Sequence, residues 1–144
     1  EYTDVDGQKK TPYIIHRTSL GCYERTLAYL IEKYAGALPM WLSPEQVRVF
    51  PVSERQLSGC GEVVKKLEEA GLRVTLDDRN EKVGYKIREA QSQKIPYMLV
   101  IGDKEAEDGT VAVRTRKGGD EGTMSLEAFL SQVKQEIAEK STRV

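Results

Sequence analysis

Between Val47 and Ile101, short apolar runs alternate with segments whose apolar residues recur every three or four positions. The apolar runs are Val47–Val52, Leu72–Leu76 and Tyr97–Ile101. Each has the length of a buried strand and is rich in β-branched or aromatic residues. A strand-helix-strand-helix-strand order requires parallel strands with right-handed crossovers, so the pattern predicts an α/β fold.

The C-terminal part extends this fold. Thr110–Arg116 is predicted to pair with Tyr97–Ile101 across an acidic turn at Asp103–Gly109, which adds an antiparallel edge to the sheet. A long amphipathic helix follows, capped by Ser125. The helix around Val63 is expected to begin late, near Glu62, because glycines 59 and 61 each cost roughly 1 kcal/mol inside a helix. The fold class is therefore α/β, with a mixed, mostly parallel sheet and flanking helices.

The first 42 residues follow a different pattern. An Asp-Gly turn between polar arms predicts a hairpin in residues 1–12, and Tyr13–Ile15 is expected to form a strand. Helical spacing predicts a helix over Cys22–Ala35 that Gly36 closes. Pro39–Pro44 is interpreted as a linker, and the sequence Ser-Pro-Glu-Gln from Ser43 predicts a single helical turn. We therefore divide the chain into residues 1–42 and 43–144.

Composition limits the classes of function. The chain has 144 residues with 39% hydrophobic and 31% charged residues, which is ordinary for a globular domain. No apolar run approaches the roughly 20 residues of a membrane span. The chain has only two cysteines, which form no metal-type pair such as C-x-x-C, and this favours a reducing, cytoplasmic setting. Glycine-rich phosphate loops are absent, and the one histidine, His16, has no nucleophile motif beside it. The start at Glu1 suggests a piece of a longer protein.

Positive charge is concentrated in residues 79–117. This stretch holds nine Lys and Arg against six Asp and Glu, whereas the rest of the chain holds thirteen against seventeen. It contains one predicted helix start and two predicted strands, whose ends can meet at one edge of the sheet. A basic surface of this kind indicates nucleic-acid binding.

Several motifs in order along the chain resemble class II aminoacyl-tRNA synthetases. The segment 16–25, which ends in Gly21-Cys-Tyr-Glu-Arg25, resembles motif 3 of their catalytic domain. Segment 34–47 is similar to the junction that follows, and segments 78–88, 97–105 and 111–116 are similar to their anticodon-binding domain. The combination is most similar to threonyl-tRNA synthetases. The resemblance implies that residues 1–42 are a strand-helix remnant of the catalytic domain and that residues 43–144 are the anticodon-binding domain.

The resemblance also implies roles in the parent enzyme. Arg25 takes the position of the motif 3 arginine that contacts ATP, bound with magnesium; read alone, it is a surface arginine that pairs with an acid. His16 takes the position of one zinc ligand, although a lone histidine after an apolar strand is usually structural. The remaining zinc ligands of the family lie upstream of this chain. We therefore expect neither zinc nor ATP to be bound by this piece alone.

The anticodon contacts are implied in the same way. Residues at the family's contact positions are Asn80, Lys82, Arg88, Glu105 and Arg114. Amide and guanidinium groups read base edges, and a carboxylate accepts from base amino groups. The alternative is that Arg88 and Glu105 form a structural ion pair on a solvated surface.

The resemblance implies that the parent is threonine–tRNA ligase, which activates threonine with ATP and transfers it to its tRNA. Motifs 1 and 2 of the class are absent from this sequence, so we expect this piece to recognise the anticodon without catalysis. The expected partner is threonine tRNA, with no membrane; the parent is expected to be a homodimer and this piece a monomer. The alternative function is a non-catalytic module that binds nucleic acid or protein through the same α/β domain.

Overall fold

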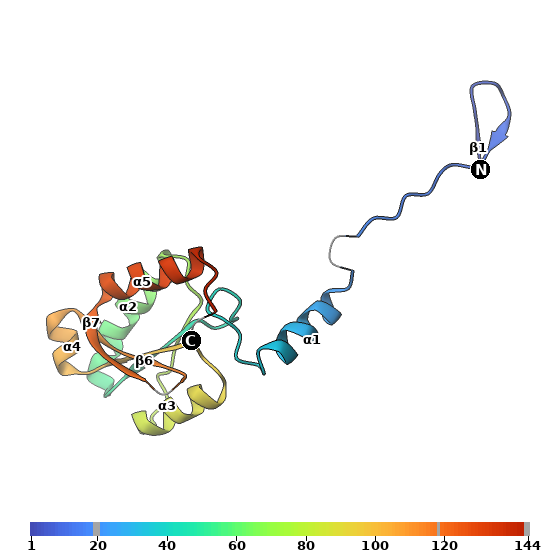
Figure 1. Ribbon diagram of the computed structural model, residues 1–144. Coiled ribbons are helices and arrows are strands. Elements are labelled where there is room, and N and C mark those ends of the chain that lie inside the picture. The colour runs from blue at the N-terminus through green and yellow to red at the C-terminus, as the bar shows by residue number, and fades with distance from the viewer. Residues whose placement is uncertain (19–20, 118, 143–144) are drawn as a thin grey trace.

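A computed structural model of the chain describes residues 1–18, 21–117 and 119–142. Figure 1 shows an α/β body formed by the later part of the chain, from which the N-terminal part projects. This projecting part contains a small hairpin of β1 (Tyr2–Thr3) and β2 (Lys9–Lys10), followed by α1 (Tyr23–Lys33). The body therefore contains the sheet that the alternating pattern predicts.

Within the described residues, five strands form one mixed sheet in the order β4-β3-β5-β6-β7. The strands are β3 (Val47–Pro51), β4 (Val74–Leu76), β5 (Tyr97–Ile101), β6 (Thr110–Thr115) and β7 (Asp120–Ser125). β3 pairs in parallel with β4 and β5, whereas β6 pairs antiparallel with β5 and β7. The mixed α/β sheet predicted from the sequence is confirmed. β7 was not predicted, because its polar and mostly exposed residues lack the alternation of a half-buried strand.

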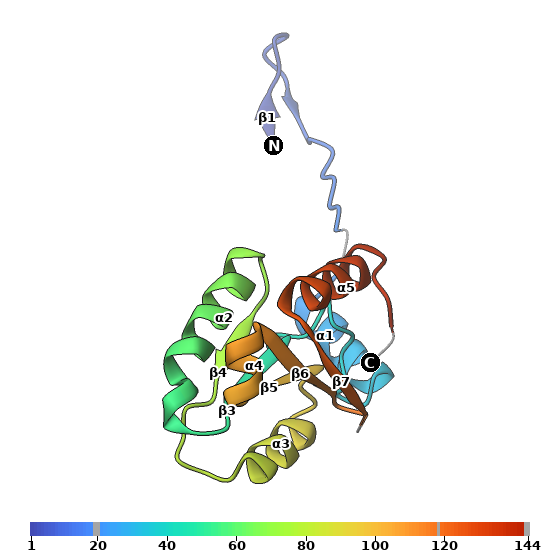
Figure 2. The same cartoon turned by 90° about the vertical axis from the view of Figure 1, so that its left-hand side faces the viewer.

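Helices cover the two faces of the sheet unequally. α2 (Leu57–Glu69) and α5 (Leu126–Ala138) lie on one face, and α3 (Val83–Ser92) lies on the other (Figure 2). α4 (Asp103–Asp108) is a short helix between β5 and β6. α3 is the one described helix on its face, and the cluster beneath it contains side chains of β3 and β5 but none of β6 or β7.

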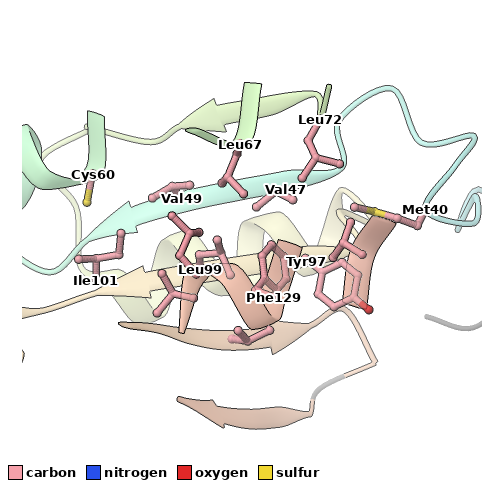
Figure 3. Packing of buried hydrophobic residues seen from close by; sticks show 14 residues of the cluster. Met40, Val47, Val49, Cys60, Leu67, Leu72, Tyr97, Leu99, Ile101 and Phe129 are labelled. Atoms are coloured by element: carbon pink, nitrogen blue, oxygen red, sulfur yellow. The ribbon is translucent and has the colours of Figure 1, made fainter. Parts of the chain in front are cut away.

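The main hydrophobic core lies between the sheet and helices α2 and α5 (Figure 3). Leu67 on α2 and Phe129 on α5 are fully buried against strand residues. The rings of Tyr97 and Phe129 meet edge to face, with centroids 5.4 Å apart. A smaller cluster beneath α3 contains Phe50, Ala90, Ile95 and Met98. Burying side chains of this size contributes about 1.5–3 kcal/mol each.

Two predictions about the body are wrong. Residues 103–108 form the helix α4, where a turn was predicted, because the Glu105 carboxylate accepts from the backbone N–H of Gly102 and caps the helix start. α2 begins at Leu57, well before Glu62. An upstream 3₁₀ turn, η1 (Glu54–Gln56), leads directly into α2, and burial of Cys60 offsets the cost of the flanking glycines.

The N-terminal part also departs from prediction. The hairpin and α1 are confirmed, but Tyr13–Ile15 is not a strand and its side chains are about nine-tenths or more exposed. A strand needs a partner for its backbone groups, and no described strand lies beside this segment.

The segment interpreted as a linker, Pro39–Pro44, packs on the body through the fully buried Met40. It contains no helical turn at Ser43, since the hydroxyl of Ser43 donates to the carbonyls of Leu38 and Pro39 and does not cap a following helix.

Candidate nucleic-acid interface

The face of the sheet beneath α3 is only partly covered. α3 packs over β3 and β5 through the cluster that contains Ala90 and Met98. In the antiparallel pair β5–β6, Met98 lies opposite Arg114, so both side chains project from this same face. Val111 and Val113 project from the opposite face into the main core. We call the part of this face beyond that cluster, formed by Ala112, Arg114 and Thr123, the open sheet face.

Arg114 is the cation of the open sheet face. One of its guanidinium nitrogens donates to the Asp120 carboxylate of β7 at 2.7 Å. The side chains are 38% and 59% exposed. An exposed pair of this kind contributes little to stability, so a phosphate or a base edge can replace the carboxylate at small cost.

Asn80 and Lys82 lie in the segment that joins β4 to α3. Lys82 is the residue that precedes the first turn of α3, and its carbonyl accepts from the backbone N–H groups of Tyr85 and Lys86. Asn80 is exposed, and within the described ranges its side-chain amide has no hydrogen-bond partner. Its donor and acceptor are therefore available to a ligand.

Arg88 lies on an exposed flank of α3. Its position follows from that of Lys86, whose ammonium group is buried against the end of β4. The two residues are about 200° apart around the helix and Lys86 lies on its buried side, so the side chain of Arg88 points away from the end of β4 and into solvent. The alternative ion pair between Arg88 and Glu105 does not occur in the described part of the chain.

Glu105 lies in the first turn of α4, beyond the carboxyl end of β5. Its carboxylate accepts from the backbone N–H of Gly102 at 3.0 Å, which leaves it half-buried. Because β4 and β5 run in the same direction, Glu105 and the segment containing Asn80 emerge at the same edge of the sheet. Glu105 thus already has a structural role that its sequence position did not reveal.

The five candidate residues fall into two groups. Asn80, Lys82 and Glu105 follow the carboxyl ends of the parallel strands, and Arg88 and Arg114 border the α3 side of the sheet. None is joined to another by a hydrogen bond or ion pair among the residues described. Together the two groups supply three cations, an amide and a carboxylate, which are groups that bind phosphates and unpaired bases.

Sequence reasoning missed a buried ionic group beneath this surface. Asp77 and Lys86 are 6% and 2% exposed, and Arg79 donates twice to the Asp77 carboxylate, at 2.9 and 2.6 Å. The Arg79 hydrogen bonds hold the pKa of Asp77 below its ordinary value. The spacing of Lys86 from Val83 and Ala90 places it beside the apolar face of the helix, which was the available signal.

The two residues assigned to the parent's catalytic domain lie apart from this surface. Arg25 is exposed on α1, and His16 is exposed in the segment before it. In the described ranges no group of three His, Cys, Asp or Glu side chains could hold a metal ion, so the residues present do not fit a zinc site. None of the described helices has the length and apolar character that crossing a membrane requires.

Comparison with known proteins agrees with this architecture. Residues 46–136 match the family model described as an anticodon binding domain. The chain is 56% identical over 139 residues to threonine–tRNA ligase of Clostridium perfringens, covering 96% of this chain and 22% of that protein. It is 52% identical over 141 residues to the same enzyme of Caldanaerobacter subterraneus, covering 98% and 22%. The chain thus spans about a fifth of the length of these relatives.

Solved structures give the same result. The RNA binding domain of threonyl-tRNA synthetase from Cryptosporidium parvum superposes with a TM-score of 0.75 at 35% identity, covering 81% of this chain and 29% of that one. Prolyl-tRNA synthetase of the same organism, solved with L-proline and AMP, gives 0.63 at 27% identity, covering 71% and 22%. The chain therefore belongs to the anticodon-binding domain family, in its threonyl-tRNA synthetase branch.

Proposed function

We propose that this chain is the C-terminal part of a threonine–tRNA ligase and that it binds the anticodon of threonine tRNA. The observation that carries the proposal is the open sheet face, where Arg114 and the flank of α3 bearing Arg88 border a surface that no described helix covers. In a domain of this family, such a surface offers cations and base-reading groups to a single-stranded loop.

Each candidate residue has a chemical role in this proposal. Arg88 and Arg114 bind phosphate oxygens or the acceptor edges of bases, and Lys82 adds positive charge at the start of α3. Asn80 presents both a donor and an acceptor, which suits one base edge. Glu105 accepts from a base amino group with the carboxylate that also caps α4.

We also propose that residues 1–42 belong to the catalytic domain of the parent and that residues 43–144 are the anticodon-binding domain. Tyr13, Ile14 and Ile15 expose apolar side chains almost completely, which supports their burial against further parts of a longer protein. In that parent, Arg25 contacts ATP bound with magnesium, and His16 contributes one zinc ligand with others supplied from outside this chain. The parent is a homodimer, and this piece alone is not catalytic.

Binding to RNA hairpins tests the proposal. The chain is titrated with the anticodon stem-loop of threonine tRNA and with the same stem-loop carrying altered anticodon bases. The native loop should bind more tightly, and Arg88→Ala and Arg114→Ala should each reduce the discrimination by about 1–3 kcal/mol. Lys134→Ala on the opposite side of the body, an exposed cation of α5, is the matched control and should leave discrimination intact.

The non-catalytic module is the second candidate, and it predicts a different outcome. A general polyanion surface binds both stem-loops equally, and its affinity falls with salt because phosphate contacts release counterions. Equal binding of the two loops would therefore rule out anticodon recognition by this chain.

A further inference from the structure

We propose that Lys86 and Asp77 are positioning residues that hold residues 78–82, and with them Asn80, in the conformation that reads the anticodon. This inference rests on the proposed function, because anticodon binding is what would require residues 78–82 to be held in one conformation. It adds two buried residues that do not themselves touch RNA.

The geometry ties the helix to the end of the neighbouring strand. The ammonium group of Lys86 donates to the backbone carbonyl of Asp77 at 2.8 Å and lies 3.7 Å from a carboxylate oxygen of the same residue. Asp77 in turn donates its backbone N–H to the carbonyl of Val49 at 3.0 Å, which fixes it to β3. Both ends of the 78–82 segment are thereby held relative to the sheet.

Arg79 and Glu81, the two neighbours of Asn80, are also held by hydrogen bonds. Arg79 binds the Asp77 carboxylate with two nitrogens and also pairs with Glu89 of α3. The backbone N–H of Glu81 donates to the carbonyl of Arg79 at 2.8 Å, which closes a tight turn with Asn80 at its tip. Asn80 therefore has a restrained backbone and a side chain with no protein partner in the described residues. This is the arrangement expected of a preorganised contact.

Burying the charge of Lys86 carries a desolvation cost that a well-packed apolar residue would avoid. Lys86 is 2% exposed, and its polar contacts are both with Asp77. An apolar side chain could fill the space beneath α3 but could not fix the carbonyl from which the segment departs. The presence of a lysine at this position therefore indicates that its role is to hold residues 78–82 in one conformation.

The experiment measures discrimination between the native and altered stem-loops in a double-mutant cycle of Lys86→Met and Asn80→Ala. Methionine keeps the length of the side chain and removes its donor. Discrimination is the Kd for the altered stem-loop divided by the Kd for the native one. Each single variant should lower this Kd ratio by about tenfold, the size of one lost base contact. The double variant should lose no more than either single variant, because both remove the same contact. Amide hydrogen exchange at Arg79 and Glu81 should accelerate in Lys86→Met.

Val133→Ala on α5 is the matched control, since it creates a cavity in the core on the other face of the sheet. It should lower stability and leave the Kd ratio unchanged. If Lys86→Met does not fold, Arg79→Ala replaces it, because the side chain of Arg79 is 46% exposed and its loss removes the contacts with Asp77 and Glu89 that restrain the residues around Asn80.

Additive losses in the double variant, or an unchanged Kd ratio in Lys86→Met, would overturn the positioning role while leaving anticodon recognition standing. If the unaltered chain binds both stem-loops equally, the proposed function itself fails, and this inference fails with it.

Discussion

The guanidinium of Arg116 donates to the carbonyl oxygen of Leu38 at 2.6 Å, although 78 residues separate them in the chain. The same guanidinium also donates to the carbonyls of Ala37 at 3.0 Å and Lys94 at 3.2 Å. The residue just after β6 thus holds the segment that follows α1 and Lys94, two residues beyond the end of α3. Arg116 is two residues from Arg114, so the sheet that presents the proposed RNA contact also anchors the entry into the domain.

Replacing Arg116 with methionine should loosen this anchor. Three carbonyl oxygens lose a charged donor, so we expect the free energy of unfolding to fall by about 2–3 kcal/mol. Urea unfolding measures this change, and limited proteolysis should show faster cleavage in residues 34–42. Lys117→Met, at the exposed neighbouring position, is the control. Equal protease resistance of the two variants would contradict the anchoring role.

Ser125 should contribute measurably to the stability of α5. Its hydroxyl oxygen accepts from the backbone N–H of Ala128 at 3.2 Å, which satisfies one donor at the helix start. Ser125→Ala should therefore lower the free energy of unfolding by about 1 kcal/mol. Ser131→Ala, at an exposed position inside the same helix, should be neutral or slightly stabilising because alanine has the higher helix propensity. A thermal or urea denaturation series distinguishes the two, and equal effects would contradict the capping role.

Acid should weaken the protein partly through Asp77. Hydrogen bonds from Arg79 hold the pKa of this carboxyl below its ordinary value of 3.8. The stabilisation is present above that value and is lost as the pH falls through the lower pKa of the folded state. The Asp77→Asn variant should be less stable than the unaltered chain near neutral pH, and the difference in unfolding free energy should shrink as the pH falls below about 4.

Unfolding free energies measured across that pH range test this prediction. Asp78→Asn, at the exposed neighbouring residue, is the control, and its unfolding free energy should follow that of the unaltered chain across the pH range. If the unfolding free energies of Asp77→Asn and the unaltered chain differ by the same amount at every pH, the Asp77 carboxyl does not have the lowered pKa.

The two thiols should differ in reactivity. Cys60 is fully buried, and this burial raises the pKa of its thiol to about 11. Cys22 is exposed before α1. Alkylation at mildly alkaline pH should modify Cys22 rapidly and Cys60 only after denaturation, because the thiolate is the reactive form. Peptide mapping by mass spectrometry measures both rates, and Cys22→Ser should remove the fast phase. Rapid modification of Cys60 in the native protein would contradict its burial.

Local patterns were sufficient for much of the fold. The periodic apolar residues located α3, α5 and strands β3, β5 and β6 to within a few residues, since those side chains form the core, and they also located α1, which has no buried residues. They failed where contacts between distant residues decide the structure. β7 has a polar sequence and forms because β6 offers it backbone partners. The helix α4 was missed for a local reason, since the cap between Glu105 and Gly102 leaves no apolar period in the sequence.

The candidate site divides in the same way. The residue types at Asn80, Lys82, Arg88, Glu105 and Arg114, and the family they indicate, could be inferred from the sequence because the motifs are contiguous. Their placement could not, since the sheet order brings β6 beside β5 and leaves the open sheet face uncovered.

The sequence by itself determined an α/β domain of the anticodon-binding family and the chemistry of its exposed groups, because hydrophobic period and short motifs are properties of neighbouring residues. Only the tertiary structure decided that Lys86 is buried against Asp77 and that Arg116 holds Leu38. In both contacts a charged side chain donates to a backbone carbonyl oxygen, and the folded chain decides which carbonyl lies within reach. Every residue has the same carbonyl group, so the sequence does not indicate which one will be the partner.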